Sequence, residues 1–206
     1  MKRFRFTLLA ICLVLLYLGW TDIALFLRNP SPATVSIEEL EKGNVPREWL
    51  HVTGGHQNLL EAISTSGSVE LESFLVPLKS SPEEASFHIL VETRNPRILE
   101  LLATYHFQLD SAEAKEDYLK AHAAEFQGER DVTGMVVSGL ITSGNRDKLM
   151  KLAKEVGMQV PPDVLFLSEG KEPGHWRGFF YLGVGLLGLI KVLMLWKKPS
   201  QAAVEG

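Results

Sequence analysis

Residues 6–27 read FTLLAICLVLLYLGWTDIALFL, and near the other end residues 178–196 read GFFYLGVGLLGLIKVLMLW. At about 1.5 Å rise per residue, the first stretch would extend about 33 Å as a helix, enough to cross a hydrocarbon core of about 30 Å. The second stretch lies close to the minimum length for a span. The pair predicts two transmembrane helices around residues 28–177, with a basic tail of residues 1–5 and a second tail of residues 197–206.

A cleaved signal peptide is the alternative interpretation of the first stretch. Such a peptide has a shorter apolar region, of about 7–15 residues, that ends in small residues. Here the apolar run continues to Leu27 and is followed by Arg28, Asn29 and Pro30. The sequence therefore favours an uncleaved anchor.

Cations lie at the outer edges of both stretches: Lys2, Arg3 and Arg5 before the first, Lys197 and Lys198 after the second. Because cytoplasmic flanks carry the excess of Lys and Arg, we expect both termini in the cytoplasm and residues 28–177 outside. The short tails are typical of bacterial proteins. The localisation predicted is therefore the bacterial inner membrane, with a periplasmic domain.

Membrane-border residues fit this orientation. Aromatic side chains favour the interface, and three tryptophans lie at the predicted borders: Trp20, Trp176 and Trp196. Lys191 lies close enough to the inner border for its long side chain to reach the headgroups. Asp22, near the outer border, could reach water or Arg177.

Glycines mark one side of the second span. Residues 183–188 match the spacing of a dinucleotide-binding fingerprint, but that site needs a strand before it and a solvated phosphate site after it. Gly178, Gly185 and Gly188 instead fall near one face, where small residues let helices approach closely. We expect them to pack on the first span, with homodimerisation as the alternative; the small residues there are Ala10, Gly19 and Ala24.

The intervening segment is acidic and lacks cysteine. Residues 28–177 hold 15 Lys and Arg against 23 Asp and Glu, a formal charge of −8, whereas the whole chain has −4. A charge of this sign disfavours binding to nucleic acid. Disulfides cannot stabilise the segment, so a domain of this length must rely on its core.

Local patterns predict strands and helices within this segment. A capping box at Ser36 predicts a short helix over residues 34–43, and helix starts follow at Asn95, at Asp110 or Ser111, and at Asn145. Branched and aromatic runs predict strands over residues 48–53, 58–64, 70–78, 87–93, 131–140 and 164–167. The pairs Gly54-Gly55 and Ser66-Gly67 predict turns between the first three strands.

This order predicts an α+β fold with a small, mainly antiparallel sheet or partly open barrel and inserted helices, flanked by two transmembrane helices. Four strands, a helical insert and a further strand would suit an oligonucleotide/oligosaccharide-binding (OB) barrel.

No motif for a reaction or a cofactor stands out. Six histidines lack the spacing of metal ligands, the only thiol, Cys12, lies in a predicted span, and no Gly-x-Ser-x-Gly elbow occurs. The sequence therefore predicts no metal site, no cofactor and no catalytic residues. The carboxylate runs are typical of solvated helix faces.

The expected function is therefore non-enzymatic: an acidic external domain that acts as an interaction or assembly module. Its expected partners are the lipid bilayer and another membrane or envelope protein, or a second copy of the chain. The alternative is a ligand-binding or hydrolytic domain acting on lipid or envelope substrates. A cleft of convergent polar groups including His51, His56 or Glu92 would favour that alternative.

Overall fold

The computed structural model divides the chain into two compact units. One consists of Met1–Pro30 with Pro173–Gly206, and the other of Ser31–Glu172. The structure describes residues 2–64, 73–84, 86–137, 150–151, 154, 160–161 and 163–197, without the side chains of residues 2–4, 195 and 197.

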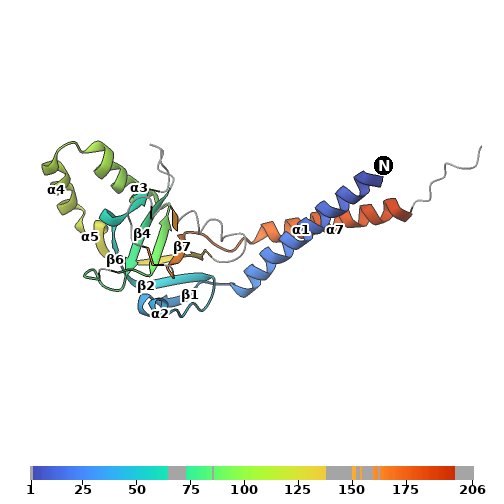
Figure 1. Ribbon diagram of the computed structural model, residues 1–206, viewed down its shortest axis with the longest axis horizontal. Coiled ribbons are helices and arrows are strands. Elements are labelled where there is room, and N and C mark those ends of the chain that lie inside the picture. The colour runs from blue at the N-terminus through green and yellow to red at the C-terminus, as the bar shows by residue number, and fades with distance from the viewer. Residues whose placement is uncertain are drawn as a thin grey trace, which may run out of the picture. The chain divides into compact units, whose positions relative to one another are not determined.

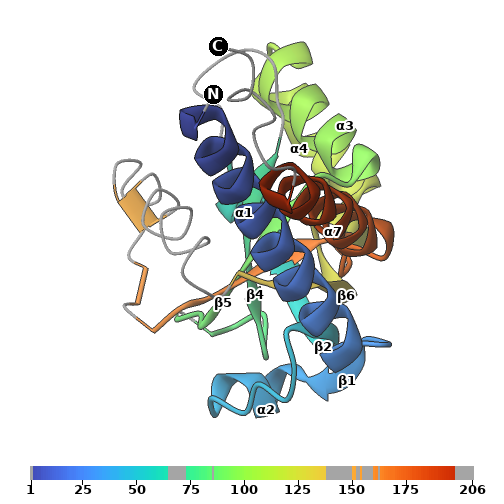
Figure 2. The same ribbon diagram turned by 90° about the vertical axis from the view of Figure 1, so that its right-hand side faces the viewer.

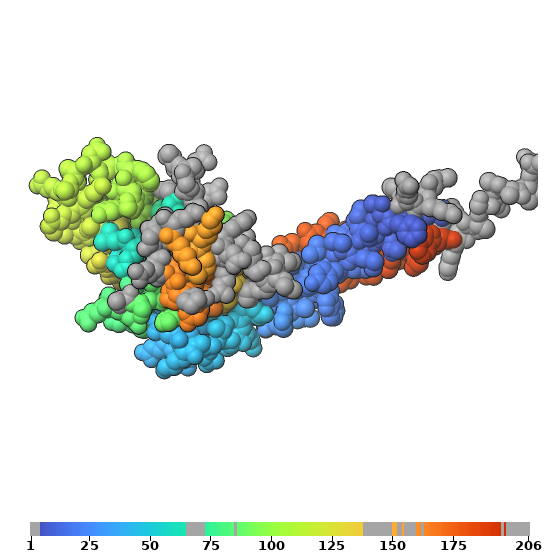
Figure 3. Space-filling model, viewed as in Figure 1, coloured from blue at the N-terminus to red at the C-terminus, as the bar shows by residue number. Residues whose placement is uncertain are grey.

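The first unit is a pair of antiparallel helices, α1 (Lys2–Arg28) and α7 (Trp176–Lys197), that lie side by side and cross (Figure 2). They touch along their length (Figure 3). Ring contacts join their ends, Phe6 with Trp196 and Phe26 with His175, at centroid distances of 6.2 and 4.7 Å. Both helices are long and apolar enough to cross a membrane by length and composition.

The second unit is built on a barrel of five strands (Figure 1). Hydrogen bonding runs around a closed ring in the order β2–β6–β7–β5–β4 and back to β2, and β5 with β7 is its one parallel pair. The ring strands are β2 (Trp49–Asn58), β4 (Phe74–Lys79), β5 (Ile89–Thr93), β6 (Gln127–Val136) and β7 (Leu165–Glu169). Two short strands extend the sheet, β1 (Ala33–Ser36) beside β2 and β3 (Ile63–Ser64) beside β4.

Helices occupy the connection between β5 and β6. They are α3 (Pro96–Ala103), the π-helical turn η2 (Thr104–Gln108), α4 (Ala112–Ala121) and α5 (Ala123–Phe126). Two more short helices are α2 (Ile37–Glu41) and η1 (Leu59–Glu61). The expected α+β class is confirmed, and of the expected small, mainly antiparallel sheet or partly open barrel the structure shows a small five-strand barrel whose hydrogen bonding closes. Three ring strands precede these helices and two follow, whereas four strands were expected before the helices.

Side-chain caps explain where several helices begin. Ser36 accepts a hydrogen bond from Glu39 N at 3.3 Å, Asn95 from Arg97 N at 3.0 Å, and Ser111 from Ala114 N at 3.1 Å. The starts at Ser36 and Asn95 were expected from the sequence and are confirmed, and of the two expected caps Asp110 and Ser111 the structure shows Ser111. The helix at Ser36 is shorter than residues 34–43, because residues 33–36 pair with β2 as a strand.

The turn expected at Gly54-Gly55 is wrong. β2 continues through both glycines and forms a bulge against β6, where the register shifts between Val52 and Gly55. Gly54 adopts φ 72, which a glycine reaches without steric cost. The bulge keeps one long strand instead of two short ones, so the strand expected at residues 58–64 becomes the end of β2, η1 and β3.

Other expected elements have different boundaries in the structure or lie outside the described residues. The strand expected at residues 131–140 begins earlier, at Gln127, because β6 pairs with β2 from Asn58 onward. The turn at Ser66-Gly67 and the cap at Asn145 lie outside the described residues.

Two apolar clusters make up most of the domain's core. The first fills the barrel and includes Leu50, Val52, Leu78, Ile89, Val91, Val132 and Leu167. The second joins the β4 side chains Phe74 and Val76 to the helices through Leu59, Ile98, Leu101, Leu102 and Phe126. The helices thus cover barrel positions that would otherwise expose apolar surface.

Candidate functional site

The parallel strands β5 and β7 end together, and a cleft of about 330 Å³ lies at their ends. Glu92 of β5 is in register with Ser168 of β7. The cleft is lined by Glu92, Arg94, Ser168, Glu169, Gly170 and Lys171. Because parallel strands present their carboxyl ends at one edge, residues about 75 positions apart meet here.

Both carboxylate oxygens of Glu92 accept hydrogen bonds within this cleft. Ser168 Oγ donates to Glu92 Oε2 at 2.7 Å, and Arg94 Nη2 donates to Glu92 Oε1 at 3.2 Å. The Glu92 side chain is 19% exposed, whereas that of Arg94 is 68% exposed. Glu92 therefore orients its two partners at the wall of the cleft.

Glu169 forms the inner wall and joins the cleft to the barrel interior. Arg130 Nη2 donates to Glu169 Oε1, and Arg130 Nη1 donates to Gln57 Oε1 at 2.9 Å. The Arg130 and Glu169 side chains are 17% and 16% exposed. The second oxygen, Glu169 Oε2, is buried and has no hydrogen-bond partner among the described residues. This carboxylate therefore has a spare acceptor.

Strand alternation explains why these polar residues face inward. Arg130 lies two residues before the core residue Val132 on β6, and Glu169 two residues after the core residue Leu167 on β7. Gln57 reaches the same face only because the bulge adds a residue to β2. Its Nε2 donates to the backbone oxygen of Glu125 at 3.0 Å, which ties the network to α5.

A smaller hollow of about 120 Å³ lies beside the junction of β2 and β4, with His56 and Lys79 in its lining. Lys79 is nearly buried, and its Nζ lies 2.9 Å from Glu61 Oε2 and 3.0 Å from Oε1. Asn58 Nδ2 donates to the same carboxylate at 3.1 Å. The charge of Lys79 is thus compensated by Glu61 beside this hollow, and we interpret the pair as structural.

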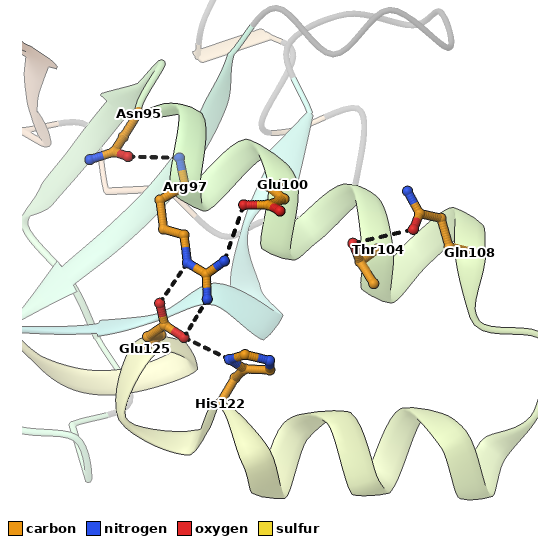
Figure 4. Close-up of polar contacts among 7 residues, drawn as sticks. All are labelled: Asn95, Arg97, Glu100, Thr104, Gln108, His122 and Glu125. Carbon is orange, nitrogen blue, oxygen red and sulfur yellow. Dashed lines mark hydrogen bonds and ion pairs between the residues drawn. The ribbon is translucent and has the colours of Figure 1, made fainter.

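A charged network joins α3 to α5 on the helical side of the domain (Figure 4). Arg97 donates to both oxygens of Glu125, at 2.8 and 3.0 Å, and to Glu100 at 3.1 Å. His122 Nδ1 lies 2.7 Å from Glu125 Oε2. Hydrogen bonds from Arg97, and then from His122, lower the pKa of Glu125 to about 2. The hydrogen bonds that Arg97 donates to Glu125 and Glu100 raise the pKa of Arg97. This network stabilises the helical layer.

The glycines singled out on the second span all face α1. A Cβ added at Gly178 would lie 3.1 Å from the Gly19 oxygen, and one at Gly185 would lie 3.2 Å from the Cys12 oxygen. A Cβ at Gly188 would lie 2.5 Å from Cys12 Sγ. These positions let the two helix backbones approach within the chain. Gly19 lies in this contact, as one of the three small residues expected there.

A salt bridge joins the same two helices. Arg177 Nε donates to Asp22 Oδ2 at 2.7 Å, and Arg177 Nη2 donates to Asp22 Oδ1 at 3.0 Å. The expectation that Asp22 could reach Arg177 is therefore confirmed. Bidentate geometry of this kind fixes orientation as well as charge.

The border residues lie at exposed positions of the hairpin. Trp20, Trp176 and Trp196 are 65%, 84% and 49% exposed, and Lys191 is exposed as well. Arg5 is half-buried. Lys198 lies outside the described residues, as do the side chains of Lys2, Arg3 and Lys197.

The histidines singled out in the sequence do not converge. The bulge returns His51 and His56 to one face, since their partners Thr133 and Glu129 lie four residues apart on β6. That spacing corresponds to about 13 Å along a strand, too far to share one ion. His51 Nδ1 instead lies 2.7 Å from Thr133 Oγ1. Among the residues searched, no three His, Cys, Asp or Glu side chains could hold a metal ion.

Arg130, Glu169 and Gln57 were missed by sequence reasoning, whereas Glu92 was singled out and does line the cleft. Arg130 lies 73 residues from Gln57 and 39 residues from Glu169, and separations of this size match no sequence motif. One pattern could have indicated them: both Arg130 and Glu169 stand at even offsets from apolar residues of their strands, which predicts polar side chains facing a core.

Comparisons of the chain with family models, with curated proteins and with solved structures find no match.

Proposed function

We propose that this protein is anchored in a membrane by the α1–α7 hairpin and that its acidic barrel domain is an interaction or assembly module for another membrane or envelope protein. One observation carries the anchoring. Large apolar side chains are exposed on both helices, among them Leu13, Tyr17, Phe180 and Leu187 at 54–70%. A helix that is apolar all round requires apolar surroundings, which a bilayer supplies.

The antiparallel arrangement of the hairpin supports one topology. If both helices span the bilayer, the two chain ends lie on the same side of it. The cations of both tails, Lys2, Arg3, Arg5, Lys197 and Lys198, then favour the cytoplasm. We propose the bacterial inner membrane as the location, with residues 28–177 outside the cytoplasm.

The charge of the domain supports a protein partner with a basic surface. The excess of eight acidic residues in residues 28–177 would attract such a surface and speed association. On α4, Glu113, Glu116 and Asp117 are carboxylates of this kind. Because the chain tethers the domain at both ends, a partner in the same membrane is favoured over a freely diffusing one.

Purification from native membranes tests the interaction. The tagged full chain is extracted in mild detergent at low salt, and bound proteins are identified by mass spectrometry. We expect a stoichiometric membrane or envelope protein that dissociates as salt is raised. A variant with Glu113→Gln, Glu116→Gln and Asp117→Asn should retain less of this partner protein than a control variant in which three lysines are replaced by glutamine. A pure monomer or homodimer would contradict the proposal.

Labelling with a membrane-impermeant maleimide tests the topology. Cys12 is the chain's only cysteine and is buried, so a new cysteine reports its own side of the membrane. We expect Glu113→Cys to be labelled in cells whose outer membrane is permeabilised, and Gly206→Cys only after the inner membrane is opened. The reverse pattern would contradict the orientation.

The cleft at β5 and β7 favours a second candidate, a ligand-binding domain. Its support is local: a mixed set of charges and a spare buried acceptor on Glu169. The two candidates are compatible, because a docking domain can also bind a small ligand.

A further inference from the structure

We propose that the cleft at the ends of β5 and β7 binds a small zwitterion of the aminoalkyl phosphate class, whose primary ammonium faces Glu169 and whose phosphate faces Arg94 and Lys171. This inference goes beyond the docking role and does not depend on it. It rests on the positions of the two kinds of charge, on the state of Glu169 and on the size of the cleft.

Glu169 supplies the acceptor for an ammonium group. One of its oxygens accepts from Arg130, while Oε2 is buried with no partner among the described residues. A buried carboxylate oxygen without a donor is unfavourable, so an N–H group that reaches Oε2 after a small movement of this side chain, which is 16% exposed, gains more than it would elsewhere. Arg130 is itself held by Gln57 at 2.9 Å, which keeps the carboxylate in place.

Arg94 and Lys171 supply the opposite charge. The Arg94 guanidinium has five N–H donors, and among the described residues it uses one of them, on Glu92 at 3.2 Å. Lys171 follows a tight turn in which Gly170 has φ 71 and Gly170 N donates to Thr133 O at 2.9 Å. The turn holds this exposed lysine at the lining of the cleft. Two cations suit a phosphate better than a singly charged carboxylate.

The other carboxylate of the cleft does not compete for the ammonium group. Both oxygens of Glu92 accept hydrogen bonds, from Ser168 and from Arg94. Among the described side chains of the lining, Glu169 therefore has an oxygen without a donor, and Arg94 and Lys171 have N–H donors without an acceptor. A simple cation or a simple anion would use one part of this set, whereas a zwitterion uses both.

The size of the cleft limits the ligand. A volume of about 330 Å³ corresponds to about ten water-sized groups at about 30 Å³ each. Phosphoethanolamine falls within this limit. The same group occurs free in solution and as the headgroup of phosphatidylethanolamine, so both sources share the recognised chemistry.

Calorimetric titration of the purified full chain in detergent micelles with phosphoethanolamine tests the site. We expect saturable binding, and at least about tenfold weaker binding of phosphocholine, whose methylated nitrogen has no N–H to donate to Glu169. Equal binding of the two compounds, or no binding of phosphoethanolamine at millimolar concentration, would overturn the proposal.

Variants at exposed positions locate the site without endangering the fold. Arg94→Gln and Lys171→Gln should each weaken phosphoethanolamine binding several-fold, whereas the control Lys120→Gln on α4 should leave it unchanged. Glu169→Gln should weaken binding and reduce the preference over phosphocholine. If Glu169→Gln fails to fold, the other two variants and the phosphocholine comparison still decide. Binding unaffected by Arg94→Gln and Lys171→Gln would refute this site.

Bilayer discs distinguish the two sources of the ligand. The full chain is placed in discs of phosphatidylcholine with or without phosphatidylethanolamine, and free phosphoethanolamine is titrated. Weaker apparent binding in the discs with phosphatidylethanolamine would support the lipid headgroup as the ligand, and equal binding in both discs would support the free compound. No binding in either disc would overturn the proposal.

Discussion

The hairpin and the barrel place their large apolar side chains in opposite ways. In the hairpin, Gly19 and Gly178 bring two backbones together, while large apolar side chains point outward. In the barrel, apolar side chains point inward, and an ion pair of Arg130 and Glu169 shares that interior with them. The hairpin thus exposes large apolar side chains, whereas the barrel buries them.

This comparison separates two kinds of contact. In a bilayer, which provides little hydrophobic drive for helices to associate, the hairpin would depend on close backbone packing and on polar contacts such as Arg177 with Asp22. Burial in the barrel draws on the hydrophobic effect, which tolerates a polar pair only when that pair is well partnered. Four substitutions test how far the contrast holds.

Glu169→Ala should have the largest effect. Removal of this carboxylate leaves Arg130 without its charge partner in a mostly buried position, and we expect a loss of about 3 kcal/mol. Hydrogen exchange of the β6 and β7 amides in the full chain measures the loss. Glu116→Ala is the matched control, since Glu116 and Lys120 form an exposed pair with side chains 68% and 67% exposed. That change should cost at most about 0.5 kcal/mol. Equal losses would show that burial of the Arg130 pair is unimportant.

Gly19→Leu should separate the helices of the hairpin. A Cβ at Gly19 would lie 2.7 Å from Leu182 N and 2.8 Å from Gly178 O, and backbone atoms cannot yield as a flexible side chain does. We expect a loss of about 2 kcal/mol, within the range for overpacking.

Gly183→Leu is the control for this change, because nothing lies within 4 Å of a Cβ at that position. SDS-induced unfolding in mixed micelles, followed by tryptophan fluorescence, compares the two variants. If Gly183→Leu destabilises as much as Gly19→Leu, close approach of the backbones is not what holds the hairpin.

Gly54→Val should damage the barrel through its backbone. Gly54 has φ 72, where a residue with a Cβ costs about 1–2 kcal/mol, and a branched side chain is least suited to it. Denaturant unfolding of the full chain measures the change. Gly54→Asn should cost clearly less, because Asn tolerates this conformation. Equal costs for Val and Asn would point away from the bulge geometry.

Glu125→Gln should have the smallest effect, visible mainly in the pH dependence of stability. The partners of Glu125 lower its pKa from 4.5 to about 2 in the folded state. Its contribution is therefore complete above about pH 4.5 and is lost as the pH falls toward 2. The difference in Tm between wild type and variant should shrink over that interval.

Arg97→Met provides the companion measurement. It removes the largest cause of the lowered pKa, so the pKa of Glu125 should rise toward its ordinary value. The stability of this variant should therefore lose the same dependence on pH between about pH 4.5 and 2. A Tm difference that stays constant from pH 5 to pH 2.5 would contradict the role of this network.

Local chemistry made several elements predictable from the sequence. Ser36, Asn95 and Ser111 cap helices because their side chains bond to amides two or three residues away. The two apolar helices follow from length and composition in the same way. The expectation of a turn at Gly54-Gly55 failed, because a glycine with positive φ serves a turn and a bulge equally well, and only pairing with β6 selects the bulge.

The sequence by itself therefore determined the two apolar helices, the α+β class, the acidic charge of the domain and the helix starts at Ser36, Asn95 and Ser111. Each of these depends on neighbours within a few residues or on composition. Tertiary structure alone decided the closed ring, the inward position of Gln57, and the meeting of Arg130 with Glu169 and of Glu92 with Ser168. The physical reason is that strand register joins residues 39 to 76 positions apart, and no local pattern of side chains specifies that register.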